Sequence, residues 1–510
     1  MIDPQTVAQY GLPGHLQAVP DEIDAVDLPV TGTLPPELDG RYLRNGPNPL
    51  PGRRGGHLQA GPGMLHGVRL RGGRAEWYRN RWVRTGAFHD KPFVTPDGRI
   101  DLTATSANTH VMAHAGRVYA LVEVGLPYEV TPGLATVGPC DFGGRLTTAM
   151  TAHPKTDPDT GELHFFGYGF VPPFLTYHRL DAKGELVHSR EVPVRAGTMM
   201  HDFAVTEHHV VWLDLPMTFQ LSLAAQGIPY GWDEAHGARL GLMRHDRPGA
   251  EVTWFEIEPC WVFHVGNAHE DAGGRVVLDA VRYPPAEWTA LWAMLSRADA
   301  ARGFSPRLSR ADAERTFGPL PPPAGTGRGF GPLPPPTGTG RGFGPLPPQT
   351  SAGLGAPAVG RSSLHRWILD PATGRATEQQ LDDRVVEFPT IDDDLTGRRS
   401  RYLYTVTGNE PRSRDRCAIV KYDDVTGTCA THEPDGDTMV GEAVFVPAAP
   451  GPRREDDGWL MAVATRRDGS ASQLLVLDAS RVEGGPVASV ELPRGVPAGF
   501  HGSWIPESGG

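Results

Sequence analysis

One segment sets the pattern for the whole chain: Thr198-Met-Met-His-Asp-Phe-Ala-Val205, which continues as Thr206-Glu-His-His-Val-Val-Trp-Leu-Asp-Leu-Pro216. His201 stands at the head of short apolar runs rich in valine and aromatic residues, and a proline ends the second run. Runs of this composition, bounded by turn residues, predict β-strands. The segment therefore predicts a histidine held at the end of a strand.

Three other histidines have similar surroundings of small, apolar or turn-forming residues: His153 in Thr151-Ala-His-Pro-Lys155, His264 in Trp261-Val-Phe-His-Val-Gly-Asn-Ala268, and His501 in Gly499-Phe-His-Gly-Ser-Trp504. Because the chain has 20 histidines, a single one says little about metal binding. The four lie far apart in sequence, so only a fold that brings distant strand ends together could make them one site.

Much of the remaining chain also has the sequence pattern of short β-strands. Period-2 alternation or compact apolar runs predict strands at Ala75–Val83, Arg117–Val124, Leu163–Phe170, His209–Leu215, Val252–Glu256, Arg275–Arg282, Tyr402–Val406, Trp459–Thr465 and Leu474–Leu477. A hairpin of the form strand, Asp, short loop, Gly, strand recurs, for example around Asp181 and Gly184 and around Asp370 and Gly374. Diverged hairpins spread along the chain favour an all-β fold, and a β-propeller over a sandwich.

Two segments depart from the β pattern. Ala286–Arg297 places Trp288, Leu291, Trp292 and Leu295 at helical spacing, which predicts an amphipathic helix that either packs on the body or faces a membrane. Phe-Gly-Pro-Leu-Pro-Pro recurs every 13 residues from Phe317. This segment is rich in proline and glycine, which predicts a disordered insert at about 317–357.

The domain organisation predicted from this pattern is simple. Residues 1–38 are expected to form an irregular N-terminal lead-in, because this segment is rich in proline and lacks regular periodicity. Residues 39–510 are expected to form a single β domain, interrupted by the Pro/Gly insert. The abundance of glycine (63) and proline (50) agrees with many turns and little long helix.

Composition narrows the class of partner and the compartment. The formal charge of −12 argues against a nucleic-acid partner, since phosphate binding needs a basic face. The four cysteines are scattered without a CxxC pair, which indicates reduced thiols in a cytoplasmic protein. No secretory signal or membrane-spanning run is visible, so we expect a cytoplasmic protein, with peripheral membrane contact as the second interpretation of the helix.

Four neutral imidazoles suit a first-row divalent metal, and no HExxH or CxxC motif supplies a competing site. An all-imidazole shell leaves the charge of the ion uncompensated, so carboxylates that accept the imidazole N–H groups are expected around it. Glu123, Glu387 and Glu442 each lie in an apolar, strand-like segment of the sequence, where a solvated side chain is unexpected. Each of them could equally be an exposed glutamate of a strand.

Eight short motifs follow one another from about residue 40 to 505: Arg44-Asn-Gly-Pro-Asn-Pro49, Gly63-Met-Leu-His66, Thr151-Ala-His-Pro-Lys155, Met200-His-Asp-Phe203, Phe263-His264 with Asn267-Ala268, Glu387-Phe-Pro389, Glu442 with Phe445-Val-Pro447, and Gly499-Phe-His-Gly502. In this order they resemble the motifs of the carotenoid cleavage oxygenases, a family that includes stilbene-cleaving dioxygenases and a retinoid isomerohydrolase.

The resemblance implies a seven-bladed β-propeller with a dome of loops and helices over an iron on the central axis. It implies that His153, His201, His264 and His501 bind one Fe(2+) per chain, and that Glu123, Glu387 and Glu442 accept hydrogen bonds from three of these histidines. No further catalytic acid or base is implied.

The activity implied is cleavage of a conjugated double bond by O₂ into two carbonyl products, with a hydrophobic polyene as substrate and no obligate protein partner. Phe170, Phe174, Phe219, Tyr230 and Trp232 are candidates for the wall of an apolar tunnel, or for ordinary core packing.

Three alternatives remain open. Stilbene cleavers of the family tend to carry a lysine directly before the glutamate matched by Glu123, where this chain has Val122, which favours a carotenoid or apocarotenoid over a stilbene. A non-oxidative isomerase or hydrolase, and a propeller that only binds partners, are the other two.

Overall fold

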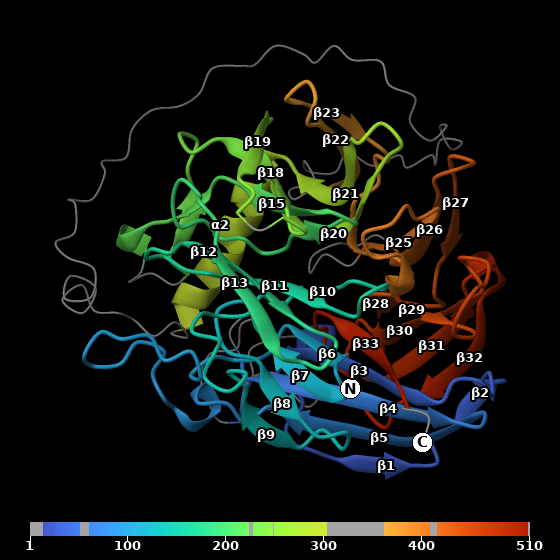
Figure 1. Ribbon diagram of the computed structural model, residues 1–510. Coiled ribbons are helices and arrows are strands. Elements are labelled where there is room, and N and C mark those ends of the chain that lie inside the picture. The colour runs from blue at the N-terminus through green and yellow to red at the C-terminus, as the bar shows by residue number, and fades with distance from the viewer. Residues whose placement is uncertain are drawn as a thin grey trace, which may run out of the picture.

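The computed structural model describes residues 14–51, 61–223, 228–247, 249–302, 362–408 and 416–507. Within them, seven sheets of four to six strands follow one another along the chain, and one two-stranded ribbon is inserted in the fourth sheet. Figure 1 shows the sheets arranged around a common centre, with β10, β20 and β28 close to it and β1, β23, β27 and β32 at the rim. The fold is a seven-bladed β-propeller, as expected from the resemblance.

The strands of the first three blades have these bounds: β3 (Gly40–Pro47), β4 (Gly63–Arg71) and β5 (Arg74–Trp82); β6 (His110–His114), β7 (Arg117–Leu121), β8 (Tyr128–Val130) and β9 (Thr136–Pro139); β10 (Lys155–Thr156), β11 (Leu163–Tyr168), β12 (Leu175–Leu180) and β13 (Leu186–Glu191). The fourth and fifth blades contain β14 (Ala204–Val205), β15 (His209–Asp214), β18 (Ala238–Arg244) and β19 (Val252–Ile257); β20 (Trp261–Glu270), β21 (Val276–Tyr283), β22 (Ser363–Asp370) and β23 (Arg375–Gln380).

The sixth and seventh blades contain β24 (Val386–Thr390), β25 (Tyr402–Thr407), β26 (Ala418–Asp423) and β27 (Thr428–His432); β28 (Thr438–Val440), β29 (Val444–Pro447), β30 (Gly458–Arg466), β31 (Ser472–Asp478) and β32 (Pro486–Glu491). The ribbon is β16 (Met217–Phe219) with β17 (Tyr230–Trp232). The short 3₁₀ turns are η1 (Gly14–Leu16), η2 (Ala87–His89), η3 (Leu221–Leu223), η4 (Asp393–Leu395) and η5 (Val482–Gly484).

Both ends of the chain close the ring. Strand β33 (Gly502–Pro506) pairs antiparallel with β3, so the C-terminal segment completes the first blade. From the N-terminal side, β1 (Asp24–Val26) pairs with β5 and β2 (Val30–Gly32) pairs with β32. Residues 1–38 were expected to be irregular; this is wrong for β1 and β2, which cover sheet edges that would otherwise be unpaired.

The strands and hairpins predicted from periodicity are confirmed. All nine predicted strands correspond to strands of the structure, within a few residues at their ends. In the hairpin between β12 and β13, the Asp181 carboxylate accepts hydrogen bonds from the backbone N–H groups of Lys183 and Glu185. Gly184 has φ of 81°, a conformation that glycine adopts without steric cost. The aspartate and glycine of the recurring motif therefore specify the turn.

The core lies between neighbouring blades. Trp212 on β15 is fully buried and stacks on Phe203 with ring centroids 5.7 Å apart, and Phe166 on β11 meets it edge-on at 5.9 Å. The apolar residues of strands from adjacent blades therefore face each other, and this packing fixes where each central strand ends.

Helix α2 (Pro285–Arg302) follows β21, in agreement with the predicted helix. Trp288 is completely buried and stacks on Trp261 with ring centroids 4.8 Å apart. Trp292 is also buried, and its indole N–H donates to the Tyr230 carbonyl at 2.9 Å. The two tryptophans pack on the propeller, in agreement with the interpretation that the helix packs on the body.

Three other expectations concern the chain as a whole. None of the described helices is both long and apolar enough to cross a membrane. The four cysteines are free thiols, as expected. The Pro/Gly insert predicted at about 317–357 lies outside the described residues.

Replacing Trp288 by alanine tests the packing of α2. Removing a fully buried aromatic side chain leaves a cavity, so we expect a loss of about 3–5 kcal/mol of unfolding free energy, seen as a clear fall in Tm. Val425→Ala is the control, because Val425 is 64% exposed and its replacement should change stability by about 0.5 kcal/mol or less. Equal Tm values for the two variants would contradict the packing described for α2.

Candidate metal centre

The four predicted histidines meet at the centre of the ring. His153 directly precedes β10 and His201 precedes β14, His264 lies in β20, and His501 directly precedes β33. Their ring centroids are 4.6 to 5.3 Å apart in the pairs that lie closest. The fold therefore brings together four side chains that are separated by up to 348 residues of sequence (501 minus 153).

The imidazole nitrogens are close enough to share one ion. One ring nitrogen from each of His153, His264 and His501 lies within 4.8 Å of the others, a group that could hold a metal ion. Nε2 of His201 lies 3.0 Å from Nε2 of His153. The structure thus places all four predicted histidines in one cluster.

The three predicted glutamates accept hydrogen bonds from three of these histidines. Nδ1 of His201 lies 2.9 Å from Glu123 Oε2, Nδ1 of His264 lies 2.5 Å from Glu387 Oε2, and Nδ1 of His501 lies 2.8 Å from Glu442 Oε1. A proton on Nδ1 leaves the lone pair on Nε2, the atom that faces the other histidines.

Each blade supplies one member of the cluster. The histidines belong to the third, fourth, fifth and first blades; Glu123, Glu387 and Glu442 belong to the second, sixth and seventh. Glu387 lies in β24, but Glu123 follows β7 in a turn and Glu442 lies between β28 and β29. The expectation that all three glutamates lie within strands is therefore wrong for two of them.

Irregular strand pairing in β20 and β24 sets the direction of the His264 and Glu387 side chains. The pairing of β20 with β21 shifts between Val262 and Val265, and His264 lies in this irregularity rather than at a strand end. The pairing of β24 with β25 shifts after Glu387, where Phe388 has φ of 52°. Such bulges turn a side chain out of the regular alternation, and they occur next to functional sites.

The burial of the cluster favours neutral imidazoles. Burial, and then the nearby His501 and His201, hold the pKa of His153 well below its usual value. Burial also lowers the pKa of His264, although Glu387 opposes the shift. For His201 the outcome is reversed: burial opposes charging, but Glu123 outweighs it and raises the pKa. His153 and His264 are therefore uncharged at neutral pH, as a metal ligand must be.

The pKa values of Glu442 and Glu387 are lowered in spite of their burial. Burial alone would raise the pKa of Glu442, but His501 and the hydrogen bonds lower it to about 2. The pKa of Glu387 is also lowered, because His264 and the Tyr283 hydroxyl outweigh burial. These negative charges would balance a divalent cation among the imidazoles.

One buried atom is direct support for a cation at this place. Nε2 of His264 is buried and has no hydrogen-bond partner among the described residues. A buried polar atom without a partner is costly, and a coordinated metal would satisfy it. Four nitrogen donors with carboxylates behind them suit a first-row transition metal, and such an ion would keep open positions for other ligands.

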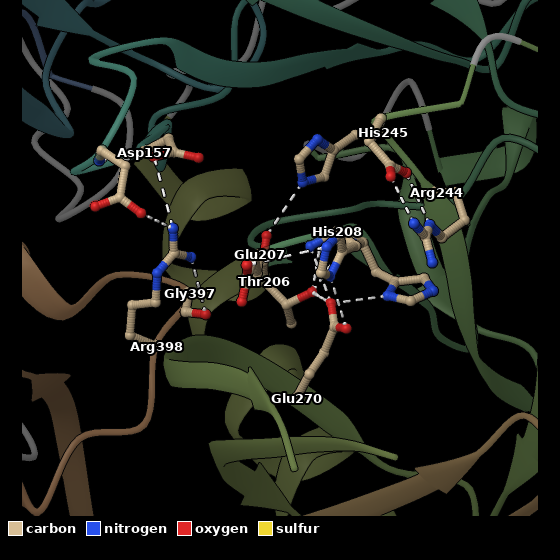
Figure 2. Close-up of polar contacts among 12 residues, drawn as sticks. Asp157, Thr206, Glu207, His208, Arg244, His245, Glu270, Gly397 and Arg398 are labelled. Carbon is tan, nitrogen blue, oxygen red and sulfur yellow. Dashed lines mark hydrogen bonds and ion pairs between the residues drawn. The ribbon is translucent and has the colours of Figure 1, made fainter. Parts of the chain in front are cut away.

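The central strands are also linked by hydrogen bonds at the ends opposite the histidine cluster. Figure 2 shows Glu270, the last residue of β20, next to Thr206 and His208 of the turn between β14 and β15. The Glu270 carboxylate accepts from the Thr206 hydroxyl at 2.6 Å and lies 3.0 Å from Nδ1 of His208. Although burial opposes it, these hydrogen bonds and that of His209 hold the pKa of Glu270 well below its usual range.

A second contact in Figure 2 joins another pair of blades. Arg398, from the segment between β24 and β25, forms ion pairs with Asp157 and Asp159 of the turn that follows β10. Strands β10, β14 and β20 thus run from His153, His201 and His264 toward this polar network. The network fixes the strands relative to one another.

The motif around His201 also contains a residue to which the sequence assigned no role. Asp202 is 2% exposed, accepts from the Val265 backbone N–H at 2.8 Å, and pairs with Lys155 Nζ at 2.8 Å. It connects the segments that carry His153, His201 and His264. A charged residue directly after a candidate ligand, in otherwise apolar text, was the signal that could have identified it.

A cavity of about 700 Å³ lies beside the cluster, and its walls include His201, His264 and His501. Of the tunnel candidates, Phe170, Phe219 and Tyr230 line this cavity; Phe174 and Trp232 are not among its walls.

The charges of the cavity are confined to the metal centre. Val122 lines the wall directly before Glu123. Among the described residues of the wall there is no lysine or arginine, and Glu123 and Glu387 are the only acidic ones. The cavity away from the cluster is thus apolar with some hydroxyl groups.

Comparisons with known proteins agree with this architecture. The family model described as retinal pigment epithelial membrane protein matches residues 16–322 and 338–506. A carotenoid cleavage oxygenase of Mycobacterium tuberculosis is 37% identical over 97% of this chain and 97% of its own length. Isoeugenol monooxygenase of Pseudomonas nitroreducens is 28% identical over 99% of this chain and 98% of its own. The crystal structure of Pseudomonas brassicacearum lignostilbene dioxygenase superposes with a TM-score of 0.75 at 24% identity, over 97% of this chain and 98% of that chain.

The central histidines and the ring around them are therefore the framework of an oxygenase. The chain belongs to the carotenoid cleavage oxygenase family, as its eight motifs indicated.

The histidine cluster predicts that His264→Ala removes most of the bound divalent metal. The three remaining imidazoles would leave the ion under-coordinated, while the blades keep their packing. Metal content per chain, measured by mass spectrometry after dialysis, should fall strongly with little change in the circular dichroism spectrum. His188→Ala, on β13 of the third blade, is the control and should keep its metal. Full occupancy in the His264 variant would exclude His264 as a ligand.

Glu387→Gln should have a milder effect than loss of a ligand. The variant keeps a side chain of the same shape but replaces the anionic acceptor of the His264 N–H by a neutral one. Loss of such a partner typically costs about 10- to 100-fold in metal affinity or activity. Chelator competition would measure this; an unchanged affinity would show that Glu387 does not orient His264.

Proposed function

We propose that this oxygenase is a non-haem Fe(II) dioxygenase that cleaves a conjugated carbon–carbon double bond of a carotenoid or apocarotenoid. One O₂ is consumed per double bond, and each carbon of that bond receives one oxygen atom, so the products are two carbonyl compounds. The single observation that carries the proposal is the apolar cavity, whose wall includes three of the four clustered histidines.

His153, His201, His264 and His501 would hold the iron, one ion per chain, through their Nε2 atoms. Bound Fe(II) would supply the position at which O₂ is activated beside the substrate. Glu123, Glu387 and Glu442 keep the Nδ1 protons in place and balance the charge of the ion. No protein acid or base is required, which fits a cavity without a nucleophile–base pair among its described walls.

The cavity supports a neutral, apolar substrate. Its volume of about 700 Å³ falls in the range of about 300–1,000 Å³ that is typical of small-molecule sites. Without a lysine or arginine in the described wall, a carboxylate on the substrate would be buried unpaired, at high cost. A polyene with hydrocarbon, alcohol or aldehyde ends fits this environment. Membrane contact remains a proposal about how such a lipid-soluble substrate reaches the enzyme.

The relatives named for isoeugenol and lignostilbene make a phenolic stilbene the second candidate substrate. Val122 favours the polyene, because it is 7% exposed and lines the cavity where a lysine anchor for a phenol is expected in stilbene cleavers. A valine offers no hydrogen bond to a phenol and suits a hydrocarbon. The polyene is therefore the proposed substrate.

A matched panel of substrates tests the proposal. We expect O₂-dependent turnover of carotenoids, apocarotenals and apocarotenols to aldehydes or ketones, with much lower kcat/KM for the corresponding apocarotenoic acid and for hydroxystilbenes. Mass spectrometry under ¹⁸O₂ should find label in both products before exchange with water. A hydroxystilbene turned over far faster than every polyene would reverse the choice of substrate. Product formed without O₂ would instead indicate an isomerase or hydrolase.

A further inference from the structure

Two tyrosines lie beside carboxylates of the metal centre in the wall of the cavity. Tyr283, the last residue of β21, donates its hydroxyl hydrogen to Glu387 Oε1 at 2.7 Å. Tyr168 is the last residue of β11, and burial together with the nearby Glu123 carboxylate raises the pKa of its hydroxyl well above the usual value. Both tyrosines are buried, and both line the cavity. Each is therefore in contact with the metal centre on one side and with the substrate space on the other.

The Glu387 carboxylate is shared between a histidine and a tyrosine. Glu387 Oε2 accepts from His264 Nδ1 at 2.5 Å and from the Phe388 backbone N–H at 2.7 Å, while Oε1 is left for Tyr283. Removing the tyrosine hydroxyl would leave Oε1 without this donor at the edge of an apolar space. The carboxylate could then rotate, and the imidazole that it holds would lose its fixed orientation.

The third carboxylate, Glu442, lies away from the cavity and has different hydrogen-bond donors. Glu442 is not part of the described cavity wall, whereas Glu123 and Glu387 are. Its Oε1 is the acceptor for His501, and its Oε2 accepts from the Gly502 backbone N–H at 2.9 Å. Glu442, away from the cavity, is thus satisfied by the backbone, whereas Glu387, which borders the cavity, has the Tyr283 hydroxyl as a donor.

The position of Glu387 gives the Tyr283 hydroxyl a second task. Glu387 lies in the wall of a cavity whose other described walls are mostly apolar. A carboxylate oxygen open to the cavity would retain water there and would disfavour the π electrons of a polyene. A phenol hydroxyl satisfies this oxygen while presenting an aromatic face to an apolar substrate.

We propose that Tyr283 is a positioning residue that orients Glu387, and through it His264, and that Tyr168 serves Glu123 and His201 in the same way. The inference rests on the proposed metal centre. Neither tyrosine takes part in bond breaking; they act through the carboxylates and on the polarity of the cavity.

Tyr230 provides a matched control on the same wall. It is 6% exposed and lines the same cavity, but its hydroxyl donates to no carboxylate among the described residues. Tyr230→Phe therefore removes a buried hydroxyl without removing a partner of the metal centre. A difference between Tyr283→Phe and Tyr230→Phe isolates the contact with Glu387.

The test uses Co(II) as the metal probe in the full chain, because its visible spectrum reports the ligand geometry. For Tyr283→Phe we expect the Co(II) dissociation constant to rise about 3- to 10-fold, less than the about 10- to 100-fold typical of losing the direct partner of a ligand. The visible bands should shift, and KM for a polyene should rise more than kcat falls. Tyr230→Phe should keep the wild-type affinity and spectrum.

The outcomes separate the inference from the function on which it rests. If Tyr283→Phe matches Tyr230→Phe in affinity and spectrum, the positioning role is overturned. If Tyr283→Phe does not fold, Tyr168→Phe is measured in its place against the same control, with the same criteria. If the wild-type chain binds neither Co(II) nor Fe(II), the proposed function fails, whatever the variants do.

Discussion

The hydrogen bonds from the imidazoles of His201, His264 and His501 to buried carboxylates are the interaction on which the rest of the structure depends. A buried divalent ion among neutral imidazoles is stable only if negative charge lies within reach and if each ring presents the correct nitrogen. The carboxylates meet both needs, since each fixes a proton on Nδ1 and carries one negative charge. His153 is the exception among the four: no carboxylate contact is described for its ring, and burial among the other histidines keeps it neutral.

The propeller makes this arrangement possible because every blade contributes one residue to the centre. Seven side chains can converge only if the ring is closed and the central strands are held in register. Closure is achieved by pairing β33 with β3 and β2 with β32. Register is supported by Glu270 and Arg398 at the opposite ends of the central strands (Figure 2). Metal binding and ring closure are therefore coupled, since a blade that moves would displace a ligand or its carboxylate.

The cavity and the metal centre place opposite demands on the same wall. The metal requires carboxylates close by, and an apolar substrate requires that their charge be hidden. The phenol hydroxyl of Tyr283 reconciles the two, because it donates to a Glu387 oxygen while the residue lines the cavity. Trp288 of α2 is buried and stacks on Trp261, which packs the helix on the propeller.

The sequence by itself determined the strands, the recurring Asp…Gly hairpins and the seven residues of the centre, because local composition and eight short motifs carry that information along the chain. It did not reveal β1 and β2, whose sequences lack periodicity and which form only because sheet edges are available to pair with them. It also left open whether Trp288 faces lipid or core. Only the tertiary structure decided that Tyr283 and Asp202 support the site, since a buried tyrosine or aspartate gains its role from partners distant in sequence. Long-range contacts of this kind depend on how the blades close, and closure is a property of the whole ring.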